Sequence, residues 1–257
     1  MTLATFILAA LAYGAASFAY GVEEEQRRGA RTLLAVAAAL HLACIGALCL
    51  EGEHPFKSVF LAASLGGFFA VSSYLVFLRG TPASLGALMS PVGLAGVVLG
   101  VLFSGQDATP LPGSHAIAKV HLGFATAGLA GFTLAAGLAA VYLVMEHRLR
   151  QKSFRPGQGG MSLTAVDRLH HRVVLLVTPV FTLAIVTGVL WIFQLGGPGM
   201  LRGRMFEVVA SVFAWAASIA VLLARAAFGT RGRQSAWLTV ASFVSVVLVM
   251  GFYGVRS

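Results

Sequence analysis

Two histidines of this chain lie within long runs of apolar residues. His41 is near the middle of the run 32–50, and His121 is close to the start of the run 115–145. If these runs are helices with a rise of about 1.5 Å per residue, His41 lies about 13 Å and His121 about 9 Å from the end of its helix. The two imidazoles then differ in depth by less than one helical turn. Two neutral imidazoles at one depth can ligate a haem iron from both sides. The alternative for each is a hydrogen bond to a hydroxyl or carbonyl group of a neighbouring helix, and residue chemistry leaves both open.

The other histidines lie in the polar gaps between apolar runs. His54 and His115 are near the same ends as the first pair, where they could guard an entrance or ligate an exposed iron, although solvated loop histidines are commoner. We expect His147, His170 and His171 to face solvent or lipid headgroups, because they lie among arginines. If the chain binds a non-covalent haem b, the pair in the apolar runs is therefore the first choice of ligands, and His54 and His115 are the second.

Few other side chains offer chemistry. The apolar runs contain no deeply placed Asp, Glu or Lys, so the carboxylate relay of a proton-coupled transporter has no candidates and only a permease for a neutral substrate would suit. No Ser–His–Asp pattern, H-E-x-x-H motif or P-loop occurs, and we expect no enzyme. Cys44 and Cys49 are separated by about 140° around a helix, which indicates two small apolar residues and not a redox pair.

The elements that must position the histidines follow from the composition. Hydrophobic residues make up 58% of the 257 residues, and charged residues only 11%. Apolar runs of about 20 residues have the length that an α-helix needs to cross a bilayer, and their continuous pattern favours helices over a β-barrel. We predict an all-α polytopic membrane protein with a single integral membrane domain over 1–257. About eight transmembrane helices are expected near residues 2–21, 32–50, 58–78, 84–103, 115–145, 172–194, 206–225 and 234–254.

The 18 Lys and Arg residues predict the orientation of these helices. If the N-terminus is outside, 13 of them lie in inner gaps, and the five in outer gaps are Lys57, Lys119, Arg202, Arg204 and Arg256. Because basic residues favour the cytoplasmic side, we predict that both termini are on the outer (periplasmic) side. The net charge of +9 is then explained by topology and membrane lipid, and we expect no nucleic acid partner.

The gap at 148–171 is the one long polar insertion. Pro156 and Gly157 interrupt the helix before it, and Ser162 or Thr164 can cap a new helix. We predict a cytosolic loop that ends in a short interfacial helix before the sixth span. Its basic residues are suited to anionic lipid headgroups or to docking a cytosolic partner.

The second half of the chain resembles the cytochrome c assembly transmembrane family, which includes CcsA-type haem delivery proteins and HemX-like and YpjD-like proteins. One similar stretch, 121–150, begins with histidine and ends in a basic tail, and a second, 163–191, contains D-R-L and ends T-G-V-L-W. The stretch 213–243 contains an R-G-R turn, and 250–256 reads M-G-F-Y-G-V-R. His41 also occupies the place of an early-span histidine in these proteins.

The resemblance implies that histidines bind haem and that haem passes to the outer face of a bacterial inner (plasma) membrane, with other cytochrome c maturation proteins as partners. The haem delivery members carry a tryptophan-rich outer loop ending W-D-P-K-E, whereas residues 194–211 here contain no tryptophan. The HemX-like branch implies an alternative. In it, a regulator or scaffold docks a cytosolic haem-biosynthesis enzyme through the basic segment 148–172 without binding haem.

Overall fold

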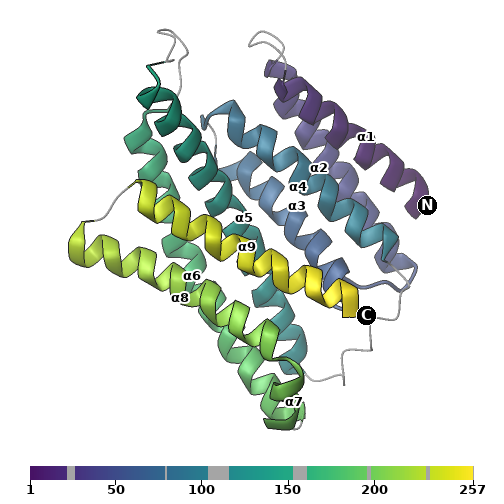
Figure 1. Cartoon of the computed structure of the whole chain (residues 1–257). Helices are drawn as coiled ribbons and strands as arrows, with labels where there is room; N and C mark the ends of the chain where they lie inside the picture. The colour runs from purple at the N-terminus through teal and green to yellow at the C-terminus, as the bar shows by residue number, and fades with distance from the viewer. Residues whose placement is uncertain are drawn as a thin grey trace. The chain divides into compact units, whose positions relative to one another are not determined.

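The computed structural model describes residues 1–21, 27–78, 80–103, 116–152, 161–195, 198–229 and 232–256. Within these ranges the chain forms nine α-helices and no strand (Figure 1). The helices are α1 (Thr2–Gly21), α2 (Arg27–Leu50), α3 (Val59–Phe77), α4 (Ala83–Leu102), α5 (Ala116–Arg150), α6 (Leu163–Leu195), α7 (Pro198–Gly203), α8 (Met205–Phe228) and α9 (Arg233–Arg256). All except α7 are long and apolar enough to cross a membrane, which makes eight candidate spans. The predicted all-α polytopic fold is therefore confirmed.

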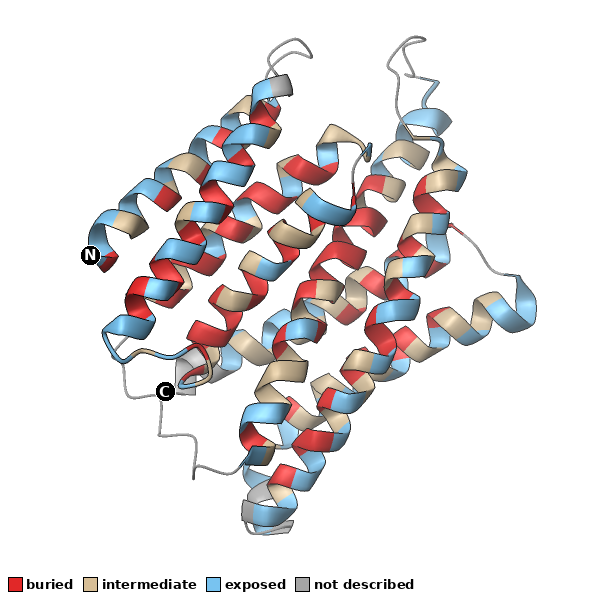
Figure 2. Cartoon of the chain, turned by 180° about the vertical axis from the view of Figure 1, so that it is seen from behind, coloured by how far each residue is buried: buried red, intermediate tan, exposed pale blue. Residues whose placement is uncertain are grey.

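Large apolar side chains are exposed along the outward sides of the helices. Phe18, Leu176 and Phe228 are 76%, 73% and 83% exposed. Figure 2 shows exposed positions recurring along the helices beside buried ones. Apolar patches of this extent are unusual on soluble proteins, whereas lipid tails are as apolar as leucine and solvate them well. These sides of the helices are therefore suited to contact with lipid.

The helices belong to two compact units. Met1–Gly113 contains α1 to α4, and Ser114–Ser257 contains α5 to α9. The prediction of one integral domain over the whole chain stays a prediction. Each unit is described by itself below, because each contains one of the two histidines that the sequence places inside a span.

In the first unit, glycines of α4 make room for tyrosines of α1. Tyr13 contacts Gly93 and Tyr20 contacts Gly86 so closely that a Cβ at either glycine would overlap the phenol ring. Helices in lipid associate through such close packing at small residues, because lipid tails offer no hydrophobic driving force between helices. As a result the ring of Tyr13 is fully buried between α1 and α4.

In the second unit, α5 and α6 form an antiparallel pair. Their contacts run in opposite directions along the two helices, from His121–Ala184 through Gly128–Phe181 to Gly131–Val177. α8 packs on α6, and α9 packs on α5 and α8. The start of α5, the end of α6 and the start of α8 therefore lie at one end of this unit. The end of α5, the start of α6 and the turn between α8 and α9 lie at the other.

The start of α6 covers the segment predicted as a short interfacial helix. In the described residues this segment is continuous with the sixth span, because α6 is a single helix of 33 residues. Its first turns are held in the second unit by the buried side chains of Asp167 and His170. Ser162 begins the helix as expected, because its hydroxyl accepts a hydrogen bond from the N–H of Ala165 at 3.2 Å. Residues 153–160, which form much of the predicted cytosolic loop, lie outside the described ranges.

The orientation in the membrane stays a prediction. We expect a reporter fused at residue 160 to be active only as a cytosolic marker, and a reporter fused after Ser257 only as a periplasmic marker, because basic residues concentrate on the cytosolic side. Paired fusions of alkaline phosphatase and green fluorescent protein measure this. A periplasmic signal at residue 160 would contradict the predicted topology.

Candidate functional site

His121 lies near the start of α5 and is bonded to α6. Its Nδ1 is 2.9 Å from the carbonyl oxygen of Ala184. Because a carbonyl oxygen can only accept, Nδ1 carries the ring proton and Nε2 keeps its lone pair. In the part of the chain that the structure describes, Nε2 has no hydrogen-bond partner. Metal-ligating histidines have this arrangement, in which a carbonyl or carboxylate fixes one ring nitrogen and leaves the other open.

Two residues of α6 lie against the imidazole of His121. Gly188 leaves the space that the ring occupies, because a Cβ there would lie 2.8 Å from Cε1. Trp191 lies beside the ring, with 5.8 Å between ring centroids and 34° between the planes. The guanidinium carbon of Arg204 lies over the indole at 5.9 Å from its centroid. The imidazole and the guanidinium therefore both lie close to the indole at one end of the second unit.

His41 lies in the first unit and is fully buried. Its Nδ1 is 3.2 Å from the hydroxyl of Tyr13, and its Nε2 is 3.0 Å from the hydroxyl of Ser64. A neutral imidazole has one donor and one acceptor nitrogen, and a hydroxyl can complement either. Both ring nitrogens are therefore satisfied by neighbouring helices. For His41 to ligate a metal, one of these hydroxyls must give up its place.

The remaining candidate ligands are not brought to His121 within the described residues. His54 is exposed, and its Nδ1 accepts a hydrogen bond from the N–H of Phe56 at 3.2 Å. His115 lies outside the described ranges. His41 and His121 belong to different units, and their pairing on one iron stays a prediction.

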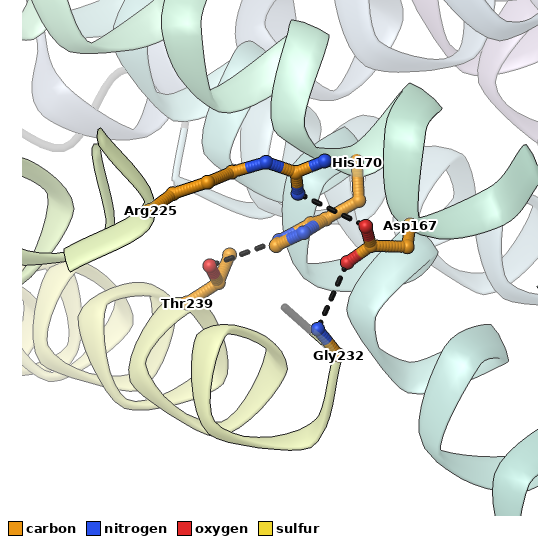
Figure 3. Close-up of polar contacts among 5 residues, drawn as sticks. All are labelled: Asp167, His170, Arg225, Gly232 and Thr239. Atoms are coloured by element: carbon orange, nitrogen blue, oxygen red, sulfur yellow. Dashed lines mark hydrogen bonds and ion pairs between the residues drawn. The ribbon is translucent and has the colours of Figure 1, made fainter. Parts of the chain in front are cut away.

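A buried ion pair lies at the opposite end of the second unit (Figure 3). Oδ2 of Asp167 on α6 is 3.0 Å from Nη1 of Arg225 on α8, and the two side chains are only 7% and 13% exposed. Oδ1 accepts a hydrogen bond from the N–H of Gly232 at 3.0 Å. Gly232 has a φ of +79° and lies against the hydroxyl of Tyr142, so neither its backbone nor its surroundings favour a side chain. One carboxylate therefore joins α6, α8 and the turn before α9.

His170 belongs to the same cluster, and the expectation that it faces solvent or headgroups is wrong. It is 2% exposed, and its Nε2 lies 3.0 Å from Oγ1 of Thr239. Thr239 donates its hydroxyl proton to the carbonyl of Ser235 at 3.0 Å, so Nε2 of His170 is the donor to Thr239. The sequence carried a signal for this cluster, because Asp167 and His170 are three positions apart and share a helix face. That this face is buried follows only from the packing of α6 on its neighbours.

The fold and these sites define a polytopic, all-helical membrane protein with imidazoles inside its spans. A family model described as Cytochrome C assembly protein matches residues 4–257, and the chain belongs to this family. Membership supports a role in cytochrome c maturation. No match is found among the curated proteins or among the solved structures. Most of the motifs that carry the resemblance lie in the second half of the chain. The family match extends over the first half as well.

Proposed function

We propose that this protein binds b-type haem non-covalently in a bacterial inner membrane and holds or passes it during cytochrome c maturation or haem homeostasis. The observation that supports this most is the state of His121, whose Nδ1 is fixed by the Ala184 carbonyl and whose Nε2 has no partner among the residues that the structure describes. An imidazole held in this way is prepared to ligate a metal without first losing a protein partner. The proposed activity is binding and transfer and not chemical turnover.

Each residue around His121 has a distinct role in the proposal. Nε2 of His121 would ligate the iron, while the Ala184 carbonyl sets the tautomer and the direction of the ring. Gly188 provides space for the imidazole, and Trp191 covers it with apolar surface. Haem itself, when bound, is the cargo and would supply an iron that histidine side chains can ligate.

As the sequence predicts, His41 would be the second residue that holds the haem iron. The sequence places it at a depth similar to that of His121, and it is a neutral imidazole held between two hydroxyls. Ligation through Nε2 would replace the contact with Ser64 and keep the contact with Tyr13. The hydroxyl oxygen of Tyr13 would then accept a hydrogen bond from the Nδ1–H group. His54 and His115 are the alternatives at the outer side.

The visible spectrum of the purified full-length protein tests the proposal. Haem added to the protein in detergent should give a saturable Soret band at a wavelength different from that of haem in detergent alone. Partitioning of haem into empty micelles supplies the background for this titration. If the protein adds nothing beyond that background, the proposed function is wrong.

Gly188→Ala is expected to lower haem affinity by about tenfold, which is the lower limit observed when the support of a metal ligand is disturbed. The added methyl group would lie 2.8 Å from Cε1 and 3.0 Å from Nδ1 of His121, so the imidazole or the helix must shift, and the shift is expected to disturb the hydrogen bond to the Ala184 carbonyl. Haem titration followed at the Soret band measures the effect. Gly123→Ala is the matched control, because a Cβ at Gly123 meets nothing within 4 Å. Equal haem affinity in both variants would contradict the role given to His121.

A further inference from the structure

The indole N–H of Trp191 is a buried donor without an acceptor. Trp191 is 7% exposed, and its Nε1 has no hydrogen-bond partner among the described residues. Trp215 shows the usual arrangement in the same unit, because its Nε1 donates to Oγ1 of Thr182 at 2.9 Å. Buried polar groups in proteins are nearly always paired, so an unpaired one calls for an explanation such as an absent ligand. The group missing at Trp191 must be a hydrogen-bond acceptor, because an indole N–H can only donate.

The surroundings of Trp191 narrow the kind of acceptor. Arg204 places a positive guanidinium over one side of the indole at 5.9 Å, and His121 lies beside it at 5.8 Å. A guanidinium has only donors and binds carboxylates through charge-assisted hydrogen bonds, which are stronger than neutral ones. A negatively charged oxygen ligand could thus accept a hydrogen bond from the indole N–H and be attracted by the positive charge of the guanidinium. It would also bring the rest of its molecule to the open Nε2 of His121.

We propose that Trp191 and Arg204 form a carboxylate site that recognises a propionate of the haem whose iron His121 ligates. This inference rests on the proposed function and adds to it the specificity of the site, which selects a porphyrin with free carboxylates over one whose carboxylates are esterified. It also orients the molecule, because the propionate edge must lie toward the start of α8, where Arg204 is located.

The general charge of this end of the unit does not explain such selectivity. Glu207, 7% exposed, follows Arg204 by three positions and brings a negative charge to the first turn of α8. Arg202 brings a second positive charge, but it is exposed on α7. We therefore assign recognition of the propionate to Arg204, because its guanidinium lies over Trp191. Replacing Arg202 with glutamine is a control, because it removes the same charge from a different position.

The experiment compares the affinity of the full-length protein for haem and for haem dimethyl ester, both followed at the Soret band in detergent. The wild-type protein should bind haem about tenfold more tightly than the ester, a difference of about 1.4 kcal/mol. Arg204→Gln should remove this preference by weakening haem binding alone, and Trp191→Phe should reduce it in part. Arg202→Gln should leave both affinities unchanged. An unchanged affinity for the ester also shows that the variant is folded.

Each other result contradicts a defined part of the proposal. If the wild-type protein binds haem and its ester equally, the carboxylate site is wrong while the proposed function stands. If Arg202→Gln and Arg204→Gln weaken haem binding equally, general charge explains the preference and the site is again wrong. If neither porphyrin binds, the proposed function fails and the carboxylate site fails with it.

Discussion

His121→Ala is expected to lower the affinity for haem by at least about tenfold, because it removes an imidazole whose Nε2 has no hydrogen-bond partner among the described residues. Burial of the apolar porphyrin can retain some haem, so reduced occupancy is expected and not complete loss. Titration of the purified variant with haem, followed at the Soret band, measures the change. Adding imidazole to the buffer should restore part of the spectrum, because the alanine leaves a space where a free imidazole can ligate.

His41→Ala is expected to convert a six-coordinate, low-spin haem spectrum into a five-coordinate one. A purely structural His41 would behave differently, because the loss of its contacts with Tyr13 and Ser64 would lower thermal stability and leave the spectrum unchanged. Recording both the spectrum and the unfolding temperature of the variant separates these two roles.

The control for the ligand assignment is His147→Ala. His147 is exposed at the far end of α5 and contacts Gln151, so its loss should not alter the spectrum. The assignment is wrong if a folded His41→Ala/His121→Ala double variant retains the wild-type spectrum. His54 and His115 would then be the next pair to test.

Asp167→Ala is expected to destabilise the protein by about 3–5 kcal/mol, the usual effect of leaving one partner of a buried ion pair without the other. Arg225 would remain 13% exposed with its charge uncompensated, and the N–H of Gly232 would lose its acceptor. Thermal or denaturant unfolding in detergent measures the loss. Asp167→Asn should cost less, because its side-chain oxygen can still accept the bond from Gly232.

Two further variants show whether the ion pair itself is responsible. Glu146→Ala removes a pair in which Nη2 of Arg150 is 2.7 Å from Oε1 of Glu146 and Arg150 is 66% exposed, so it should cost less than about 1 kcal/mol. Asp167→Ala/Arg225→Leu removes both buried charges and should be more stable than Asp167→Ala alone. If Asp167→Ala unfolds like the wild-type protein, the cluster does not hold the start of α6, the end of α8 and the start of α9 together.

The sequence alone determined the membrane fold. Its apolar runs are as long as a bilayer requires and contain almost no charge, and in lipid only a helix or a closed barrel satisfies every backbone group. Every predicted span therefore has a helix in the structure, although α6 begins nine residues before the predicted span 172–194. The position of His121 near the start of a span followed from the same pattern. The resemblance to the family that the chain belongs to came instead from sequence motifs, such as those in 121–150 and 163–191.

Only the tertiary structure decided which nitrogen of His121 is open, because the carbonyl that holds the other comes from Ala184, 63 residues away. The partners of Asp167 are likewise distant, at separations of 58 residues for Arg225 and 65 for Gly232. In a soluble helix, the apolar side predicts which residues are buried. In a membrane both lipid and protein interior are apolar, so this contrast disappears and the burial of His170 cannot be read from the pattern. The face that each helix turns to its neighbours is set by the fit of side chains between helices, and that fit exists only in the folded chain.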